Sequence, residues 1–296
     1  ILIIIQMVPA IFAGLKKSVG EAISPKAHIG LIDVSGLIMD SEKFVKQLNV
    51  FLEQKHIKGI ILKINSPGGA PGASQIMYKE ILRAKEKKPV VALVENACAS
   101  GGYYIASAAN KIIAPELSLI GSIGVLTMSP NVKELAKDWK IDVNITKAGK
   151  YKTVGNPFAE VQSDEEKAYL QVVTDDMYDQ FVGDVAKSRN IDRAEHQKWA
   201  DGKIFSGRQA LKLRLIDQVG GWSDAKEEIR KLACIKTEIK LVRQPRPSAF
   251  ASFMGGADDG ADTHLTSFVS SLAQMFSMKK QCGLENLPMY GQTAVL

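Results

Sequence analysis

The sequence predicts an α/β fold with a largely parallel sheet. From His28 onward, short apolar runs alternate with stretches of helical periodicity. Strands that alternate with helices are typical of parallel sheets covered by helices. The chain has 296 residues, 46% of them hydrophobic, which is enough for one large domain or two modest ones. We therefore expect a globular domain with a substantial core.

The elements follow one another in a regular order. Apolar runs predict strands at 29–34, 57–65, 89–94, 112–114, 123–126 and 143–145. Helical spacing predicts helices at 41–55, 74–85, 132–139, 163–187 and 223–232, with others opening at Ser100 and Gly207. A loop rich in Gly and Pro separates the second strand from its helix at 66–72. Ser163 with Glu166 has the pattern of a capping box.

The two ends differ in composition from the predicted domain at 28–243. Residues 1–15 are strongly apolar and run into Lys16 and Lys17, which predicts the end of a truncated N-terminal membrane anchor. A core strand and a signal-peptide remnant are the alternatives. Residues 16–27 are expected to be a linker, and residues 244–296 a flexible tail. A second hypothesis places the apolar stretch 287–290 of that tail in a substrate groove.

Composition argues against several classes of function. The net charge is +6, but no block of Lys and Arg interleaved with aromatic residues appears, so nucleic acid is not expected as a partner. Three cysteines lie far apart, and four histidines lack the spacing of metal ligands. No phosphate-binding loop is present. We expect neither a metal ion nor a cofactor.

Ser100 is the first candidate for catalysis. It follows the apolar strand at 89–94 and a run of small residues, and a helical pattern begins at it. A hydroxyl at a strand-to-helix turn projects from the fold beside free backbone N–H groups. A serine in this position is more commonly only the N-cap of its helix. Ser100 by itself therefore leaves both interpretations open.

Two glycine-rich turns accompany Ser100. Gly68 and Gly69 follow the second strand, where their backbone could present paired N–H donors to an oxyanion. Pro-Gly-Gly is also a common turn. Ser122 lies between Gly121 and Gly124 in a second turn that would present a hydroxyl, although such a serine often only stabilises its turn.

A serine nucleophile needs a base, and none of the histidines lies near a Gly-rich turn. Lysine is the alternative base in Ser-Lys sites, where burial lowers the pKa of the ammonium group toward neutrality. Lys147, Lys150 and Lys152 lie in or beside a loop that precedes the long helix at 163–187. Loop lysines are usually solvated. One of the three is nevertheless the expected partner of Ser100.

Several motifs together resemble the signal peptide peptidase A family, serine peptidase family S49, in its short single-repeat form. They are Asn65-Ser66-Pro67-Gly68-Gly69, Ala99-Ser100-Gly101-Gly102-Tyr103-Tyr104, Gly121-Ser122-Ile123-Gly124-Val125, Tyr151-Lys152 with Asn156-Pro157-Phe158, and the segment 200–210. The resemblance covers about residues 28–230. It implies a ClpP/crotonase-type fold built from repeated β-β-α units.

The resemblance also implies roles for individual residues. Ser100 would be the nucleophile and Lys152, which lies 52 residues later, the general base. Ser122 would orient the lysine, and the amides of Gly69 and Gly101 would form the oxyanion hole.

The function implied is that of a membrane-anchored serine endopeptidase that cleaves remnant signal peptides or other extended apolar peptides. Members of the family form rings in which neighbouring protomers can help complete each site. The implied location is the cell membrane, with a single N-terminal anchor and the catalytic domain outside the cytoplasm. The alternatives are an acyl-CoA hydratase or isomerase on the crotonase fold, a stomatin-partner type of membrane peptidase, and an inactive membrane scaffold.

Overall fold

The structure is a computed structural model that describes residues 27–243. The expected anchor, the tail and nearly all of the linker lie outside these residues. The strands are β1 (Ala27–Ile38), β2 (Ile57–Gly69), β3 (Val90–Ala99), β4 (Lys111–Ala114), β5 (Leu119–Gly121), β6 (Ile204–Ser206), β7 (Gln218–Val219) and β8 (Ile239–Val242). The helices are α2 (Glu42–Glu53), α3 (Pro71–Lys87), α4 (Gly101–Ser107), α5 (Lys133–Asp138), α6 (Asp164–Arg189), α7 (His196–Trp199), α8 (Gly207–Lys212) and α9 (Trp222–Leu232), with a 3₁₀ turn η1 (Arg193–Glu195).

The strands form one 8-stranded sheet in the order β6-β5-β3-β2-β1-β8, and β4 bridges β3 and β7. Every pair is parallel except β5 with β6. The α/β class and the largely parallel sheet are therefore confirmed. Because β1, β2 and β3 run in the same direction, their carboxyl ends meet at one edge of the sheet. Ser66, Gly69 and Ser100 all lie at that edge.

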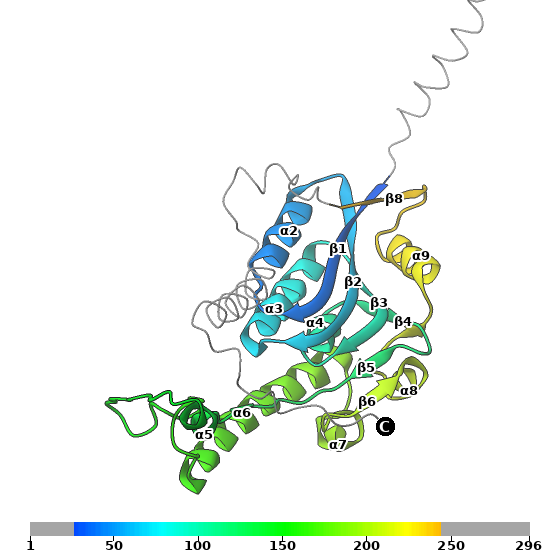
Figure 1. Cartoon of the computed structure of the whole chain (residues 1–296). Coiled ribbons are helices and arrows are strands. Elements are labelled where there is room, and N and C mark those ends of the chain that lie inside the picture. Colours follow the sequence, from blue (N-terminus) through cyan, green and yellow to red (C-terminus); the bar gives the residue numbers. More distant parts are fainter. Residues whose placement is uncertain (1–26, 244–296) are drawn as a thin grey trace, which may run out of the picture. The chain divides into compact units, whose positions relative to one another are not determined.

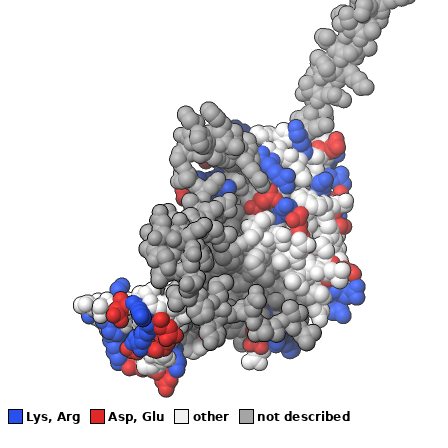
Figure 2. Space-filling view, in the orientation of Figure 1, with Lys and Arg blue, Asp and Glu red and all other residues white. Residues whose placement is uncertain are grey.

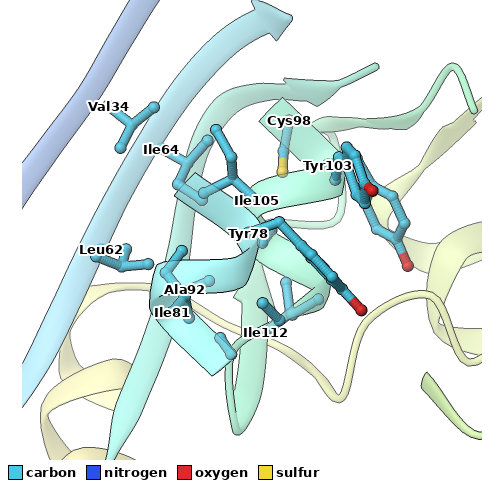
Figure 3. Close-up of a cluster of buried hydrophobic side chains, with 14 of the residues drawn as sticks. Val34, Leu62, Ile64, Tyr78, Ile81, Ala92, Cys98, Tyr103, Ile105 and Ile112 are labelled. Atoms are coloured by element: carbon cyan, nitrogen blue, oxygen red, sulfur yellow. The ribbon is translucent and has the colours of Figure 1, made fainter. Parts of the chain in front are cut away.

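Helices cover the sheet on both faces. On one face α2, α3 and α4 pack side by side against the three long strands (Figure 1). Figure 3 shows this core, in which Tyr78 and Ile81 of α3 and Ile105 of α4 lie over Leu62 and Ile64 of β2. On the other face α9 covers the amino-terminal part of the strands through Ala225 and Ile229. The long strands are apolar on both faces because both faces are covered.

The long strands change register near their carboxyl ends. The pairing of β1 with β2 shifts between Ser35 and Leu37, and that of β2 with β3 shifts between Ile64 and Ser66. The first part of β3 pairs with β4 and its last three residues pair with β5. Each long strand thus contributes two successive strand segments before its helix, in the β-β-α pattern of the ClpP/crotonase fold.

Some expected elements are placed differently. The strand expected at 123–126 is wrong: β5 ends at Gly121, and Ile123 is buried outside the sheet. The strand expected at 143–145 is also wrong, because those residues are exposed and have no strand partner. Helix α3 begins at Pro71, since proline is well suited to the first turn of a helix. Strands β6, β7 and β8 are too short to give a clear apolar pattern.

No helix between residues 27 and 243 is long and apolar enough to cross a membrane.

Candidate active site

Ser100 lies between the end of β3 and the start of α4 in a strained conformation, with φ 49° and ψ −124°. Positive φ is uncommon for a residue with a Cβ and costs about 1–3 kcal/mol, so it persists only where the surroundings enforce it. The Ser100 N–H donates to the Gly121 carbonyl at 2.8 Å. Its side chain makes no capping hydrogen bond. The interpretation of Ser100 as a side-chain N-cap is therefore wrong, and its partly exposed hydroxyl is not used by the helix.

Gly68, Gly69 and Gly101 bring the predicted oxyanion donors together beside Ser100. A Cβ at Gly68 would lie 2.7 Å from the Ser100 Cβ and 2.8 Å from the Gly101 nitrogen. A Cβ at Gly101 would lie 3.3 Å from the Gly69 nitrogen. These approaches leave no room for side chains, and φ at Gly68 is 106°. A Cβ at Gly69 would lie 2.0 Å from the Ile38 carbonyl oxygen, and a Cβ at Gly101 would lie 2.3 Å from Ser74 Oγ, so only glycine fits these positions without rearrangement.

Ser122 lies beside Ser100 because of the register between β3 and β5. Ala99 of β3 pairs with Gly121 of β5. Ser100 follows Ala99 and Ser122 follows Gly121, so the two serines leave the sheet side by side. Neighbouring strands are about 4.8 Å apart. Ser122 also has φ 49°, and its N–H donates to the Lys203 carbonyl at 2.7 Å. The segment 200–210 therefore braces the turn that carries Ser122.

Lys152 lies away from Ser100, in a part of the molecule that we call the arm, residues 126–178. The arm comprises the chain around α5, the lysine loop and the first half of α6, which Figure 1 shows projecting from the sheet. Lys150 and Tyr151 both donate to Glu165 in the first turn of α6, at 2.6 and 2.7 Å. Helix α6 contacts α4 at Phe181, which lies 16 residues after Glu165. At the rise of an α-helix, this places Glu165 about 24 Å along α6 from that contact.

The lysine side chains have different surroundings. The Lys147 Nζ donates to the Lys150 carbonyl and to Thr153 Oγ1. Hydrogen bonding to Glu165 raises the pKa of Lys150, which keeps its amine protonated. Lys152 is exposed, and within residues 27–243 its Nζ makes no hydrogen bond or ion pair. The described chain thus brings together Ser100, Ser122, Gly69 and Gly101 but does not bring any of the three lysines to Ser100.

The sequence model of a known protein family, Peptidase family S49, matches residues 83–236 of this chain. The matched segment includes Ser100, Ser122 and the lysine loop. The chain belongs to peptidase family S49. The family resemblance predicted from the motifs is therefore confirmed. Membership of this family favours the predicted peptidase over the alternative of an acyl-CoA hydratase or isomerase.

Curated relatives of this S49 peptidase agree with the match. A candidate protease of Methanocaldococcus jannaschii is 39% identical over 66% of this chain and 62% of its own. A candidate protease of Synechocystis sp. is 35% identical over 76% of this chain and 82% of its own. A candidate signal peptide peptidase SppA of Enterococcus faecium is 36% identical over 64% of this chain and 55% of its own. The matched region thus spans between about half and four fifths of these relatives.

Cys98 and three histidines of the described residues are poorly placed to act as a nucleophile or base. Cys98 is fully buried, and burial raises the pKa of its thiol far above the ordinary range, so it is unreactive. His28 and His56 stack edge to face at the starts of β1 and β2, at the opposite end of these strands from Ser100. His196 contacts Tyr178 beside η1. Between residues 27 and 243 no cluster of acidic, His and Cys side chains is suited to a metal ion.

Tyr104 of α4, the helix that follows Ser100, contacts the second half of α6, and the first half of α6 belongs to the arm. The Tyr104 hydroxyl donates to the Asp184 carboxylate of α6, and the Tyr104 ring contacts Phe181. Burial, followed by the bond to Asp184, raises the pKa of Tyr104 well above its usual range. The Tyr104 N–H also donates to the Ser100 carbonyl. Sequence reasoning missed this contact, because the two residues are 80 positions apart and no local pattern relates them.

Proposed function

We propose that this S49 peptidase is a serine endopeptidase in which Ser100 and Lys152 form a catalytic dyad. Ser100 Oγ attacks the scissile carbonyl carbon while the neutral Lys152 amine accepts the hydroxyl proton. The resulting oxyanion accepts hydrogen bonds from the Gly69 and Gly101 N–H groups. The Lys152 ammonium then protonates the leaving amine, and a water molecule hydrolyses the acyl-enzyme. Ser122 orients the lysine by a hydrogen bond.

The observation that carries the proposal is the conformation of Ser100. A strained serine at a strand-to-helix turn, with a hydroxyl that caps nothing and two glycine amides beside it, is suited to nucleophilic attack. Such strain is otherwise unfavourable, so it favours a catalytic role over a purely structural one.

We further propose that a neighbouring copy of the chain supplies Lys152. The arm is poorly covered: between residues 126 and 178 only Ala136 is buried. Large apolar side chains are exposed along it, among them Met128, Trp139, Val161 and Val172. Exposed apolar groups of this extent mark interaction surfaces. A second copy packed on the arm would bury them and would remove water from Lys152, as a lysine base requires.

The substrates that this proposal favours are extended peptides with small or apolar residues near the cut, including remnant signal peptides. Support comes from the Enterococcus faecium relative, which is named as a candidate signal peptide peptidase. Attachment to a membrane through residues 1–15, with the catalytic domain outside the cytoplasm, belongs to the same proposal. A stomatin-partner type of membrane peptidase would use the same chemistry on other substrates.

Mixing two inactive variants tests both parts of the proposal. Ser100→Ala and Lys152→Ala should each abolish hydrolysis of a fluorogenic peptide. Lys150→Ala, the matched control in the same loop, should stay active, with a loss of severalfold at most because the loop loses one contact with Glu165. After co-refolding, a Ser100→Ala chain can donate Lys152 to the Ser100 of a Lys152→Ala neighbour. We therefore expect the mixture to regain part of the activity.

Each part of the proposal has its own contrary outcome. Full activity of Lys152→Ala would refute the assignment of the base. An inactive mixture, from variants shown by light scattering to assemble together, would place the dyad within one chain. Hydrolysis that survives in Ser100→Ala would exclude the serine mechanism altogether.

A further inference from the structure

Ser66 is a buried serine whose hydroxyl links two strands at the site. Its exposed fraction is 0%. Its Oγ donates to the Gly36 carbonyl of β1 at 2.7 Å and accepts the Gly68 N–H at 3.1 Å. A buried hydroxyl with both a donor and an acceptor partner fixes the positions of the backbone groups at both ends.

The position of Ser66 in the sheet is as informative as its hydrogen bonds. The β1–β2 register shifts between Ser35 and Leu37, beside Gly36, and the β2–β3 register shifts immediately before Ser66. At such irregularities the strand ladder is interrupted locally, so side chains have to hold the backbone groups. The Ser66 hydroxyl therefore connects the β1 backbone at one register shift with the β2 backbone at the other.

Ser66 also contacts Gly102, the residue that follows the second predicted oxyanion donor, Gly101. A Cβ at Gly102 would lie 3.0 Å from the Ser66 carbonyl oxygen and 3.3 Å from the Ser66 Cβ, so the first turn of α4 rests on Ser66. Through Gly68 the same residue sets the direction of the chain that enters Gly69. One buried residue thus contacts Gly68 and Gly102, which directly adjoin Gly69 and Gly101 in the chain.

We propose that Ser66 is a positioning residue of the oxyanion hole, one that fixes the amides of Gly69 and Gly101 relative to each other. This inference rests on the proposed function. Ser66 touches no substrate, because it is fully buried. It acts through the two amides, which hydrogen-bond most strongly to the negative oxygen of the tetrahedral intermediate. Misplacement of these amides should therefore weaken transition-state binding more than substrate binding.

The experiment compares Ser66→Ala with Ser118→Ala in the full chain. Ser118 is the matched control, because it is also buried and its Oγ donates to a carbonyl, that of Pro115, at 2.7 Å. We would measure kcat and KM for a fluorogenic peptide and Ki for the corresponding peptide aldehyde, whose adduct with Ser100 resembles the tetrahedral intermediate. The amount of folded protein, measured by circular dichroism, normalises each rate.

For Ser66→Ala we expect kcat to fall about 10-fold or more and Ki for the aldehyde to rise by a similar factor, with KM within about twofold. Ser118→Ala should change none of these constants by more than about twofold. A purely structural role of Ser66 would instead lower the melting temperature and leave kcat and Ki per folded molecule unchanged. That result would overturn the inference.

A second pair of variants covers the case in which Ser66→Ala does not fold. Ser66→Thr and Ser66→Val add nearly the same volume, and they differ in that Thr keeps a hydroxyl where Val has a methyl group. The ratio of their kcat values therefore measures the contribution of the hydroxyl. We expect the Thr variant to be at least about 10-fold faster per folded molecule, and equal rates would contradict the inference. If unaltered protein and Ser100→Ala hydrolyse the peptide equally, the proposed function fails, which is a different result from either outcome at Ser66.

Discussion

The carboxyl edge of the sheet and the arm differ in how completely one chain builds them. At the sheet edge, Ser100 is held by the last residues of β3, by the Gly121 carbonyl and by a closely packed glycine backbone. On the arm, Lys152 lies in a loop attached to α6 by exposed contacts of Lys150 and Tyr151 with Glu165. Figure 2 shows acidic and basic side chains crowded over the arm.

This difference shows which half of the proposed chemistry is organised in advance. The proposed nucleophile and oxyanion donors belong to a closely packed core, where each backbone position is fixed by its neighbours. The proposed base lies on a surface that is still exposed to water. Assembly would complete the second half, and changes in the two regions should therefore affect stability and activity differently.

The largest effect is expected at the sheet edge for Gly69→Ala. The new Cβ would lie 2.0 Å from the Ile38 carbonyl oxygen, and strand backbone cannot move aside without disrupting β1. Overpacking of this kind should cost about 3 kcal/mol in the free energy of unfolding and should abolish peptide hydrolysis. Denaturant unfolding and a peptide assay measure the two effects.

Gly72→Ala, three residues later in the first turn of α3, is the matched control. A Cβ at Gly72 meets no atom within 4 Å, so stability and hydrolysis should stay close to those of the unaltered protein. Equal behaviour of the Gly69 and Gly72 variants would mean that the sheet edge is not the closely packed region described above.

An intermediate effect is expected for Tyr104→Phe, at the junction of the two regions. The substitution leaves the partly buried Asp184 carboxylate without its hydroxyl partner, which should cost about 1–3 kcal/mol. Because α6 carries the arm, we also expect hydrolysis by the assembled enzyme to fall. Thermal unfolding and kcat/KM test this prediction.

Tyr169→Phe provides the comparison for Tyr104, since it keeps the stacking of this exposed ring on Tyr151. It should leave both stability and kcat/KM nearly unchanged. A Tyr104→Phe variant that is destabilised but fully active per folded molecule would show that the junction does not guide the arm.

The smallest effect on stability is expected on the arm for Glu165→Gln. Its exposed contacts with Lys150 and Tyr151 contribute little to folding, so the melting temperature should barely change. The Gln carbonyl oxygen can still accept hydrogen bonds, but the ion pair with Lys150 is lost. If the lysine loop has to meet a neighbouring copy, this weaker attachment should still lower kcat/KM severalfold.

Glu86→Gln, an exposed change on α3, is the control for Glu165 and should affect neither quantity. Unchanged kinetics in the Glu165 variant would show that the position of the lysine loop does not limit hydrolysis.

Much of the fold was predictable because its signals are local. The long strands are continuous apolar runs, and the capping box at Ser163 is present as expected. Short elements were not predictable in this way. Strand β7 has only two residues, and β5 lies at 119–121 and not at 123–126, because its position depends on pairing with β3 and β6. Pairing between distant segments leaves little trace in a short sequence window.

The sequence alone determined where the turns with the proposed catalytic groups lie. An apolar strand followed by small residues indicates the turn at Ser100, and paired glycines indicate the turn at 68–69. Only the tertiary structure decided which groups meet. The β3–β5 register brings Ser122 beside Ser100, the side chain of Ser66 joins two irregular strands, and the length of α6 separates Lys152 from Ser100. The physical reason is that backbone conformation depends on neighbouring residues, whereas contacts between distant elements depend on packing of the whole chain.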